Sequence, residues 1–95
     1  MMLETTPFDA SNYLDTPEAI AAFLTDAFEE GDAAVISHAL GVVAKAQGMS
    51  RLAHDTGLSR QALYRSLSTG GRPELLTVLK VLNALGIRLA ATAVA

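Results

Sequence analysis

The sequence contains no cysteine, which excludes disulfide bonds, thiolate metal ligands and a cysteine nucleophile. It has no apolar run near the roughly 20 residues that a membrane span requires. It also does not begin with the basic and then apolar pattern of a secretory signal. Charged residues make up 18% of the chain against 51% hydrophobic ones, a balance that argues against disorder. We therefore expect a small, soluble, cytoplasmic protein with a packed core.

The length of 95 residues fits one compact domain and is too short for two. A core is possible, but a deep substrate cavity closed by a second lobe is not. Alanine and leucine, at 17 and 14 residues, supply 31 of the 95 positions and favour helices.

Acidic and basic residues are separated along the chain. The first 44 residues contain eight acidic and no basic residues, a net charge of −8. The remaining residues contain seven basic and two acidic ones, a net charge of +5. This asymmetry predicts a basic surface for a polyanion and an acidic surface with another use, although uneven charge is also common in small proteins.

Capping residues and glycines divide the chain into an irregular arm over residues 1–15 and a single helical domain over residues 16–95. Thr16 is followed by Pro17, which suits the first position of a helix. The five expected helices run from Thr16 to Gly31, from Asp32 to Gly48, from Ser50 to about Thr56, from Ser59 to about Leu67, and from Pro73 to Gly86. In the last helix we expect an inward stripe of Leu75, Leu76, Leu79, Leu82 and Leu85.

The last nine residues, 87–95, alternate in a way that favours a short C-terminal β-strand. A lone strand leaves its backbone amides unpaired, so it needs a neighbour. The arm at residues 1–8 or a second copy of the chain could supply one. Continuation of the helix is the alternative.

Residues 49–68 have the spacing of a helix-turn-helix motif. Ala53 is small where two helices would cross, and Gly57 can adopt the positive φ of the turn. Ser59 would cap the second helix, whose first turn would enter the major groove of DNA. Apolar contacts that fix the pair to the other helices would come from Leu52, Leu58 and Leu63.

Polar residues of this motif suit contacts with DNA. Arginine can pair bidentately with guanine and glutamine with adenine, so we expect base reading by Arg60, Gln61 and Arg65. Contacts with the DNA backbone are expected from Ser50, Arg51, Ser59, Tyr64, Gly71 and Arg72. The alternative is an ordinary solvated helical hairpin in a bundle.

From about Phe8 to Ala91, the sequence resembles the addiction-module antidote family, whose antitoxins carry a Cro/C1-type (XRE-like) helix-turn-helix. The resemblance lies in Phe8-Asp9-Ala10, Tyr13-Leu14-Asp15, Glu18-Ala19-Ile20, Glu29-Glu30-Gly31-Asp32, Gly48-Met49-Ser50, Gly57-Leu58-Ser59-Arg60, Ala62-Leu63-Tyr64, Leu79-Lys80-Val81-Leu82 and Ala84-Leu85-Gly86. It implies autorepression of a shared operon and a partner toxin of the RelE/ParE-like type, a small basic ribonuclease or gyrase poison.

The sequence departs from that family pattern at Ser66, where Cro/C1-type motifs usually place an apolar residue. We expect Leu67 to face the core instead. If Ser66 and not Leu67 faced the core, the helix would be rotated by one residue. The direction in which Tyr64 and Arg65 point is therefore open by one position.

We expect no enzyme activity, no cofactor and no metal site. His38 and His54 are the only histidines, and no carboxylate cluster surrounds them at metal-ligand spacing. His54 and Asp55 resemble a catalytic dyad, but adjacent helical residues are not expected to face each other.

The acidic residues Asp26, Glu29 and Glu30 most simply form a solvated helix face. If the resemblance holds, the same residues complement a basic toxin.

These observations predict an all-α, five-helix domain with a central helix-turn-helix and a short C-terminal strand. The favoured function is that of an antitoxin and autorepressor, a homodimer on a palindromic operator. The C-terminal strand, paired with its twin, is the first candidate for part of the dimer contact. A stand-alone transcriptional regulator without a toxin, and an interaction module that has lost DNA binding, are the alternatives.

Overall fold

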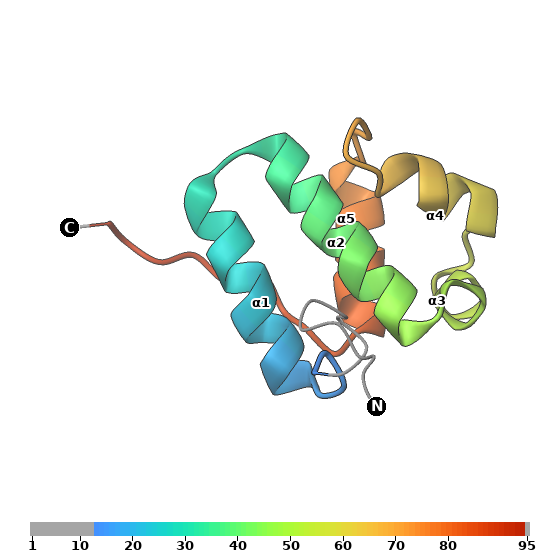
Figure 1. Cartoon of the computed structure of the whole chain (residues 1–95), viewed down its shortest axis with the longest axis horizontal. Coiled ribbons are helices and arrows are strands. Elements are labelled where there is room, and N and C mark those ends of the chain that lie inside the picture. Colours follow the sequence, from blue (N-terminus) through green and yellow to red (C-terminus); the bar gives the residue numbers. More distant parts are fainter. Residues whose placement is uncertain (1–12, 95) are drawn as a thin grey trace, which may run out of the picture.

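The computed structural model describes residues 13–94 of the chain, and in this range it is all-helical with no strand. The five helices are α1 (Pro17–Glu30), α2 (Ala33–Gln47), α3 (Met49–Thr56), α4 (Arg60–Ser66) and α5 (Leu75–Ala84). Helix α1 packs on α2, α2 packs on α3, and α3 contacts both α4 and α5. As Figure 1 shows, α1 and the α3–α4 pair lie on opposite sides of α2.

Three helices begin where the sequence predicts, because a side-chain oxygen accepts a hydrogen bond from an otherwise unpaired amide of the first turn. The distances are 3.1 Å at Thr16, 2.8 Å at Asp32 and 3.0 Å at Ser59. Helix α1 ends at Gly31, whose φ of 69° lies in the left-handed region that favours glycine. The local signals therefore place these boundaries correctly.

One apolar core joins all five helices and the segment that leads into α1. Its largest fully buried side chains are Leu14, Leu24, Leu40, Leu63, Leu82, Val43 and Val81. Leu14 precedes α1 and is also fixed through its backbone, because the side-chain Nε2 of Gln47 donates a hydrogen bond to the Leu14 carbonyl oxygen at 2.7 Å. At the end of the expected arm, Leu14 thus packs on the helices, while Tyr13 and Asp15 beside it are exposed. The rest of the arm, residues 1–12, lies outside the described part of the chain.

The expected inward stripe of α5 is wrong for three of its five leucines. Leu82 and Leu85 are buried, whereas Leu75, Leu76 and Leu79 are exposed. The core-facing side of α5 instead includes Val81, with Val78 packed at its edge. Helix α5 also begins two residues later than Pro73, with Glu74 at its N-cap. Both sides of this helix are apolar, so the sequence pattern allows two orientations, and packing against α3 selects one.

The expected C-terminal strand is not present. Residues 87–94 have no regular structure, and apart from Ile87 they are solvent-exposed. In Figure 1 this segment passes α1 and then leaves the helical body. An extended segment becomes a strand only when a neighbour pairs with its backbone. No neighbouring strand exists within residues 13–94, and one proposed neighbour, the arm at residues 1–8, lies outside the described range.

Within residues 13–94, no helix is long and apolar enough to cross a membrane.

Candidate nucleic-acid interface

Helices α3 and α4 form a compact pair joined by a short turn at residues 57–59. Gly57 has a φ of 75°, as the sequence predicts, and its backbone N–H donates to the Ala53 carbonyl oxygen at 2.9 Å. This bond closes the last turn of α3 with little strain, because glycine adopts a positive φ readily. Leu52 and Leu63 are buried and attach one helix each to the core.

The outer face of α4 presents four polar side chains at i, i+1, i+4 and i+5. These residues are Arg60, Gln61, Tyr64 and Arg65, and all four are exposed. Because residues with this spacing lie on one side of a helix, the structure brings them together. The guanidinium of Arg60 lies 6.0 Å from the centre of the Tyr64 ring. The face therefore combines two guanidinium groups, an amide and a phenol, which suit the edges of bases and phosphate oxygens.

The phase of this face follows from which side of α4 contacts the core. Leu67 is buried, as the sequence predicts, while Ser66 is only half-buried. The apolar anchors of α4 are thus Leu63 and Leu67, one helical turn apart. Tyr64 and Arg65 consequently remain on the outer side.

The C-terminal end of α4 is fixed to α2 by a buried hydroxyl. Ser37 has 1% of its surface exposed, and its Oγ lies 3.0 Å from the Ser66 carbonyl oxygen and 2.7 Å from that of Ser68. One helical turn later, α2 carries Gly41, where a Cβ would overlap the carbonyl oxygen of Leu67. A hydroxyl and a missing side chain thus let α2 approach the backbone that ends α4.

The loop after α4 is held against the same carbonyl groups. A Cβ at Gly71 would overlap the backbone of Ser66 and Arg65, so this glycine allows a close approach of the loop to α4. The hydroxyl of Thr69 lies 3.2 Å from Nδ1 of His38 on α2. Gly71 is half-buried, and Arg72 is exposed beside it. The structure therefore places Gly71 and Arg72 next to the end of α4.

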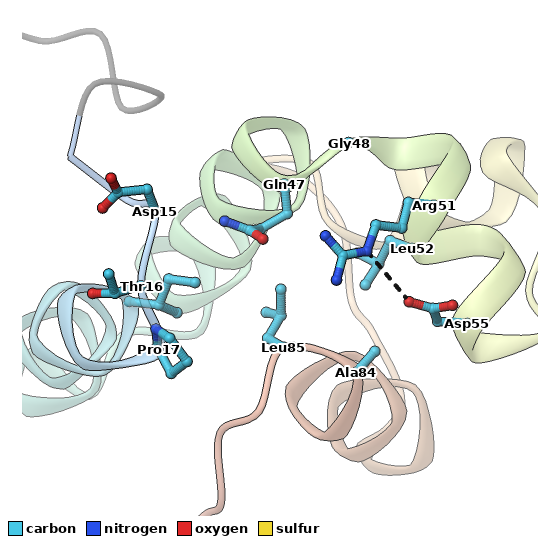
Figure 2. A pocket seen from close by; sticks show the side chains of 11 residues that line it. Asp15, Thr16, Pro17, Gln47, Gly48, Arg51, Leu52, Asp55, Ala84 and Leu85 are labelled. Carbon is cyan, nitrogen blue, oxygen red and sulfur yellow. Dashed lines mark ion pairs between the residues drawn. The ribbon is translucent and has the colours of Figure 1, made fainter.

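The expected phosphate contacts at the start of α3 differ in their surroundings. Ser50 is exposed. Arg51 is also exposed, but its Nε lies 3.7 Å from Oδ2 of Asp55, one turn along the same helix. Figure 2 shows the Arg51 side chain reaching over a pocket. The structure thus does not bring Arg51 together with the outer face of α4.

The pocket under Arg51 has a volume of about 230 Å³ and lies where the segment before α1, the end of α2, α3 and the end of α5 meet (Figure 2). Small-molecule sites usually have volumes of about 300–1,000 Å³. Two of its polar side chains already have partners: Gln47 bonds to the backbone of Leu14, and Arg51 pairs with Asp55. The pocket is therefore a packing gap between these elements and not a preformed ligand site.

His54 and Asp55, which were not expected to face each other, are in contact, with 3.3 Å between Nδ1 and Oδ1. Side chains of neighbouring helical residues can bend toward each other at the surface, and both of these are exposed. Between residues 13 and 94, no group of three or more histidine, aspartate or glutamate residues could hold a metal ion.

The acidic residues Asp26, Glu29 and Glu30 are exposed at the C-terminal end of α1. The last turn of this helix has no basic residue. Carboxylates at this end lie near the negative pole of the helix dipole, where cations are favoured. This acidic end (Asp26, Glu29 and Glu30) lies across α2 from the α3–α4 pair (Figure 1).

Ser37 and Gly41, by which α2 holds the end of α4, were not among the predicted site residues. A signal was present, because a mid-helix glycine costs about 1 kcal/mol relative to alanine and usually has a packing reason. Gly41 lies one turn after Ser37 in a part of α2 whose only other polar side chain is that of His38. This spacing indicates a close backbone contact, although it does not identify the contacting segment.

Comparison with known proteins gives one family and one relative. The family model described as "Probable addiction module antidote protein" matches residues 4–93. An uncharacterised protein of Haemophilus influenzae (strain ATCC 51907 / DSM 11121 / KW20 / Rd) is 40% identical over 81 residues, which cover 85% of this chain and 84% of the relative. No solved structure matches the chain.

Proposed function

Because this chain belongs to the family of probable addiction module antidote proteins, we propose that it is the antitoxin of a type II toxin–antitoxin module. It acts by binding and not by catalysis. It represses its own operon through a Cro/C1-type helix-turn-helix formed by α3 and α4, and it neutralises a RelE/ParE-like toxin in the cytoplasm. The observation that supports DNA binding best is the outer face of α4, where four side chains suited to DNA stand exposed together.

Base reading is assigned to Arg60, Gln61 and Arg65. Arginine offers two parallel donors to the O6 and N7 atoms of guanine, and glutamine matches the N6 and N7 atoms of adenine. The Arg60 guanidinium lies 6.0 Å from the centre of the Tyr64 ring, so a weak cation–π contact favours a position close to the helix. The fixed end of α4 supports this role, because a reading helix must keep one orientation.

Backbone contacts are assigned to residues at the start of α3, in α4 and its N-cap, and in the loop that follows α4. Arg51 first gives up its pair with Asp55, and an exposed pair of this kind is worth only about 0–1 kcal/mol. A phosphate can therefore compete for it. The full set is Ser50, Arg51, Ser59, Tyr64, Gly71 and Arg72.

A single copy of such a motif contacts only a few bases, so we propose that two copies bind a palindromic operator as a homodimer. The expected pairing of C-terminal strands is not part of this proposal, because residues 87–94 form no strand.

The DNA proposal is tested with the double variant Arg60→Ala and Gln61→Ala. The probe is a DNA fragment from directly upstream of the chain's own reading frame. A good bidentate pair contributes about 1–3 kcal/mol of discrimination, so we expect operator affinity to fall by at least about tenfold. The control, Arg88→Ala with Thr92→Ala, removes the same charge from the exposed C-terminal segment and should leave affinity unchanged.

Two results would contradict the base-reading role. One is an unchanged gel-shift affinity of the double variant. The other is an equal loss of affinity for the operator and for an unrelated fragment, which would indicate phosphate contacts only.

Toxin binding is assigned to the acidic end of α1. Its three carboxylates lie where the helix dipole disfavours them, so they do not stabilise the helix that carries them. A basic partner would provide the missing positive charge. The acidic end is also far from the DNA face in the fold, since α2 separates them (Figure 1). Both partners could then bind at once.

The toxin proposal is tested by co-expression with a small basic protein encoded beside the chain. Asp26, Glu29 and Glu30 are together changed to lysine, which should abolish co-purification. The variant should not lose thermal stability, because cations suit the C-terminal end of a helix. Asp15→Lys with Glu18→Lys, at the other end of α1, is the control and should retain the partner.

Continued co-purification of the acidic-end variant would assign these carboxylates to solubility alone. The absence of a neighbouring basic protein, with operator binding intact, would favour the stand-alone regulator. A double variant of Arg60 and Gln61 that leaves the cellular phenotype untouched would favour the interaction module.

A further inference from the structure

Helix α5 exposes three leucines within five residues. Leu75 is 67% exposed, Leu76 is 61% exposed and Leu79 is 42% exposed. They follow each other at i, i+1 and i+4, so they lie along one side of the first turns of the helix. We call this surface the leucine face.

The exposure of the leucine face is not caused by loose packing of α5 against the core. The other side of α5 is already in the core through Val81, Leu82 and Leu85, all at least 93% buried. A helix that is apolar on all sides is normally covered on all sides. Among residues 13–94, helix α5 is therefore covered on one side and exposed on the other.

We propose that the leucine face binds the leucine face of a second copy of this chain, about a two-fold axis. The three side chains expose on the order of 300 Å² of apolar surface, the size at which a patch on a soluble protein often has a function. An isologous contact places the same patch on both partners, so an apolar patch meets an apolar patch of equal size.

The charges around the leucine face agree with a second copy as its occupant. No charged residue lies between Leu75 and Leu79, while Glu74 and Lys80 flank this stretch and are exposed. An apolar centre with a polar rim is the usual arrangement of a protein interface. A strongly basic or acidic partner would find no counter-charge at the centre, and both charged surfaces of the chain lie elsewhere, on α1 and α4.

The position of α5 also suits a dimer that reads DNA, and this part of the inference rests on the proposed function. Eight residues, 67–74, separate the end of α4 from the start of α5, whose first turns carry the leucine face. The loop between them is close to the end of α4, since Gly71 abuts the backbone of Ser66 (Figure 1). Pairing here would relate the two reading helices by a two-fold axis, which is the symmetry that a palindrome requires.

The size of the leucine face predicts a weak dimer. A stable interface buries about 800 Å² on each partner, more than twice what the three leucines offer. The free protein should therefore associate reversibly, with a dissociation constant in the range of about 10 μM to 1 mM. On DNA the second half-site adds binding energy, so dimerisation should be largely coupled to operator binding.

The absence of cysteine in the chain makes cross-linking a clean test. Near a two-fold axis a residue faces its own copy, within the roughly 4.4–6.8 Å between Cα atoms that a disulfide needs. We expect Leu76→Cys or Leu79→Cys to form disulfide-linked dimers under mild oxidation. The control is Leu89→Cys, because Leu89 is also 42% exposed but lies in the C-terminal segment. Equal cross-linking at Leu79 and Leu89 would indicate random collision and overturn the proposal.

Sedimentation equilibrium tests the same contact without DNA. The wild-type chain should show self-association up to about 1 mM, and Leu76→Glu with Leu79→Glu should weaken it at least about tenfold. The leucines are exposed, so the variant should fold, which circular dichroism checks. A wild-type monomer at about 1 mM, or an unchanged dimer in the variant, would overturn the inference.

Operator binding separates this inference from the proposed function. The variant should still bind a single half-site with wild-type affinity and should lose cooperative binding to the palindrome. Cooperative binding that survives in the variant would refute the leucine face as the dimer contact. Failure of every form to bind DNA would refute the DNA proposal, while cross-linking would still decide the dimer. Cross-linking of Leu79→Cys only to a co-expressed neighbour would identify another occupant and overturn the inference.

Discussion

Removal of one hydroxyl, by Ser37→Ala, should destabilise the protein although it deletes a single atom. The Ser37 hydroxyl is buried and lies within bonding distance of two carbonyl oxygens, at 3.0 Å for Ser66 and 2.7 Å for Ser68. The Ser68 oxygen also accepts from the N–H of Gly71 at 2.9 Å, so it keeps one partner in the variant. The single hydrogen of the hydroxyl is shared between the two oxygens, and the Ser66 oxygen, which has no other partner among the described residues, would be left unpaired.

The expected cost follows from that unpaired carbonyl. A buried polar group without a partner costs about 1–3 kcal/mol. In a domain of this size each kcal/mol lowers the midpoint of thermal unfolding by about 4–8 °C, so the melting temperature should fall by about 5–20 °C. The free energy of unfolding of such a domain is only about 5–15 kcal/mol, so the substitution should remove a large share of it.

Thermal unfolding followed by circular dichroism measures this cost against a matched control. The Thr25 hydroxyl also donates to a carbonyl oxygen at 2.7 Å, that of Ala21, but at the exposed surface. Thr25→Ala should lower the free energy of unfolding by less than about 0.5 kcal/mol, since water replaces the lost bond. If the Ser37 and Thr25 variants lose the same small stability, burial of the hydroxyl does not matter and the reasoning fails.

Three further substitutions probe local features of the fold by thermal unfolding. Gly71→Ala should lower the free energy of unfolding by about 1–3 kcal/mol, because its Cβ would overlap the backbone of Ser66. The control is Gly70→Ala, which should change it by less than about 0.5 kcal/mol, because a Cβ at Gly70 has nothing within 4 Å and Gly70 has no positive φ. Equal effects of the two substitutions would contradict the close approach of Gly71 to α4. Thr16→Ala should cost about 1 kcal/mol by removing the cap of α1, and an unchanged melting temperature would show that the cap bond is not stabilising. Leu40→Ala should cost about 2–5 kcal/mol, since Leu40 is completely buried, and a loss below 1 kcal/mol would refute its place in the core.

Local signals in the sequence were sufficient for the starts of α1, α2 and α4. Thr16, Asp32 and Ser59 each act as the predicted cap, because a capping bond involves residues only two or three positions apart. The same holds for the positive φ of Gly57, which the turn after α3 requires. Such features depend on short stretches of chain and not on what packs against them.

The orientation of α5 could not be predicted in the same way. Leu75, Leu76 and Leu79 fit an inward stripe as well as Val81 and Leu82 do, because the helix is apolar on both sides. Only the surface that α3 presents decides which side is buried. The prediction of a C-terminal strand was wrong for a related reason. Alternation of apolar and polar residues indicates the two faces of a strand, but it does not show whether a partner strand exists to pair with it.

The candidate site shows the same division. The residue types of the outer face of α4 and their spacing were readable from the sequence, and the burial of Leu67 was expected from its neighbour Ser66. The clamp on the end of α4 was not, because Ser37 lies 29 and 31 positions before the carbonyl groups it bonds.

The sequence by itself determined that this is a helical chain, where α1, α2 and α4 begin, and that its acidic and basic residues are separated. Periodicity, capping and composition act over a few residues, so they can be read without a structure. The tertiary structure decided which side of α5 is covered, what holds the end of α4, and that α1 and α4 lie on opposite sides of α2. These depend on contacts between residues far apart in the chain, whose energy exists only once the core has formed.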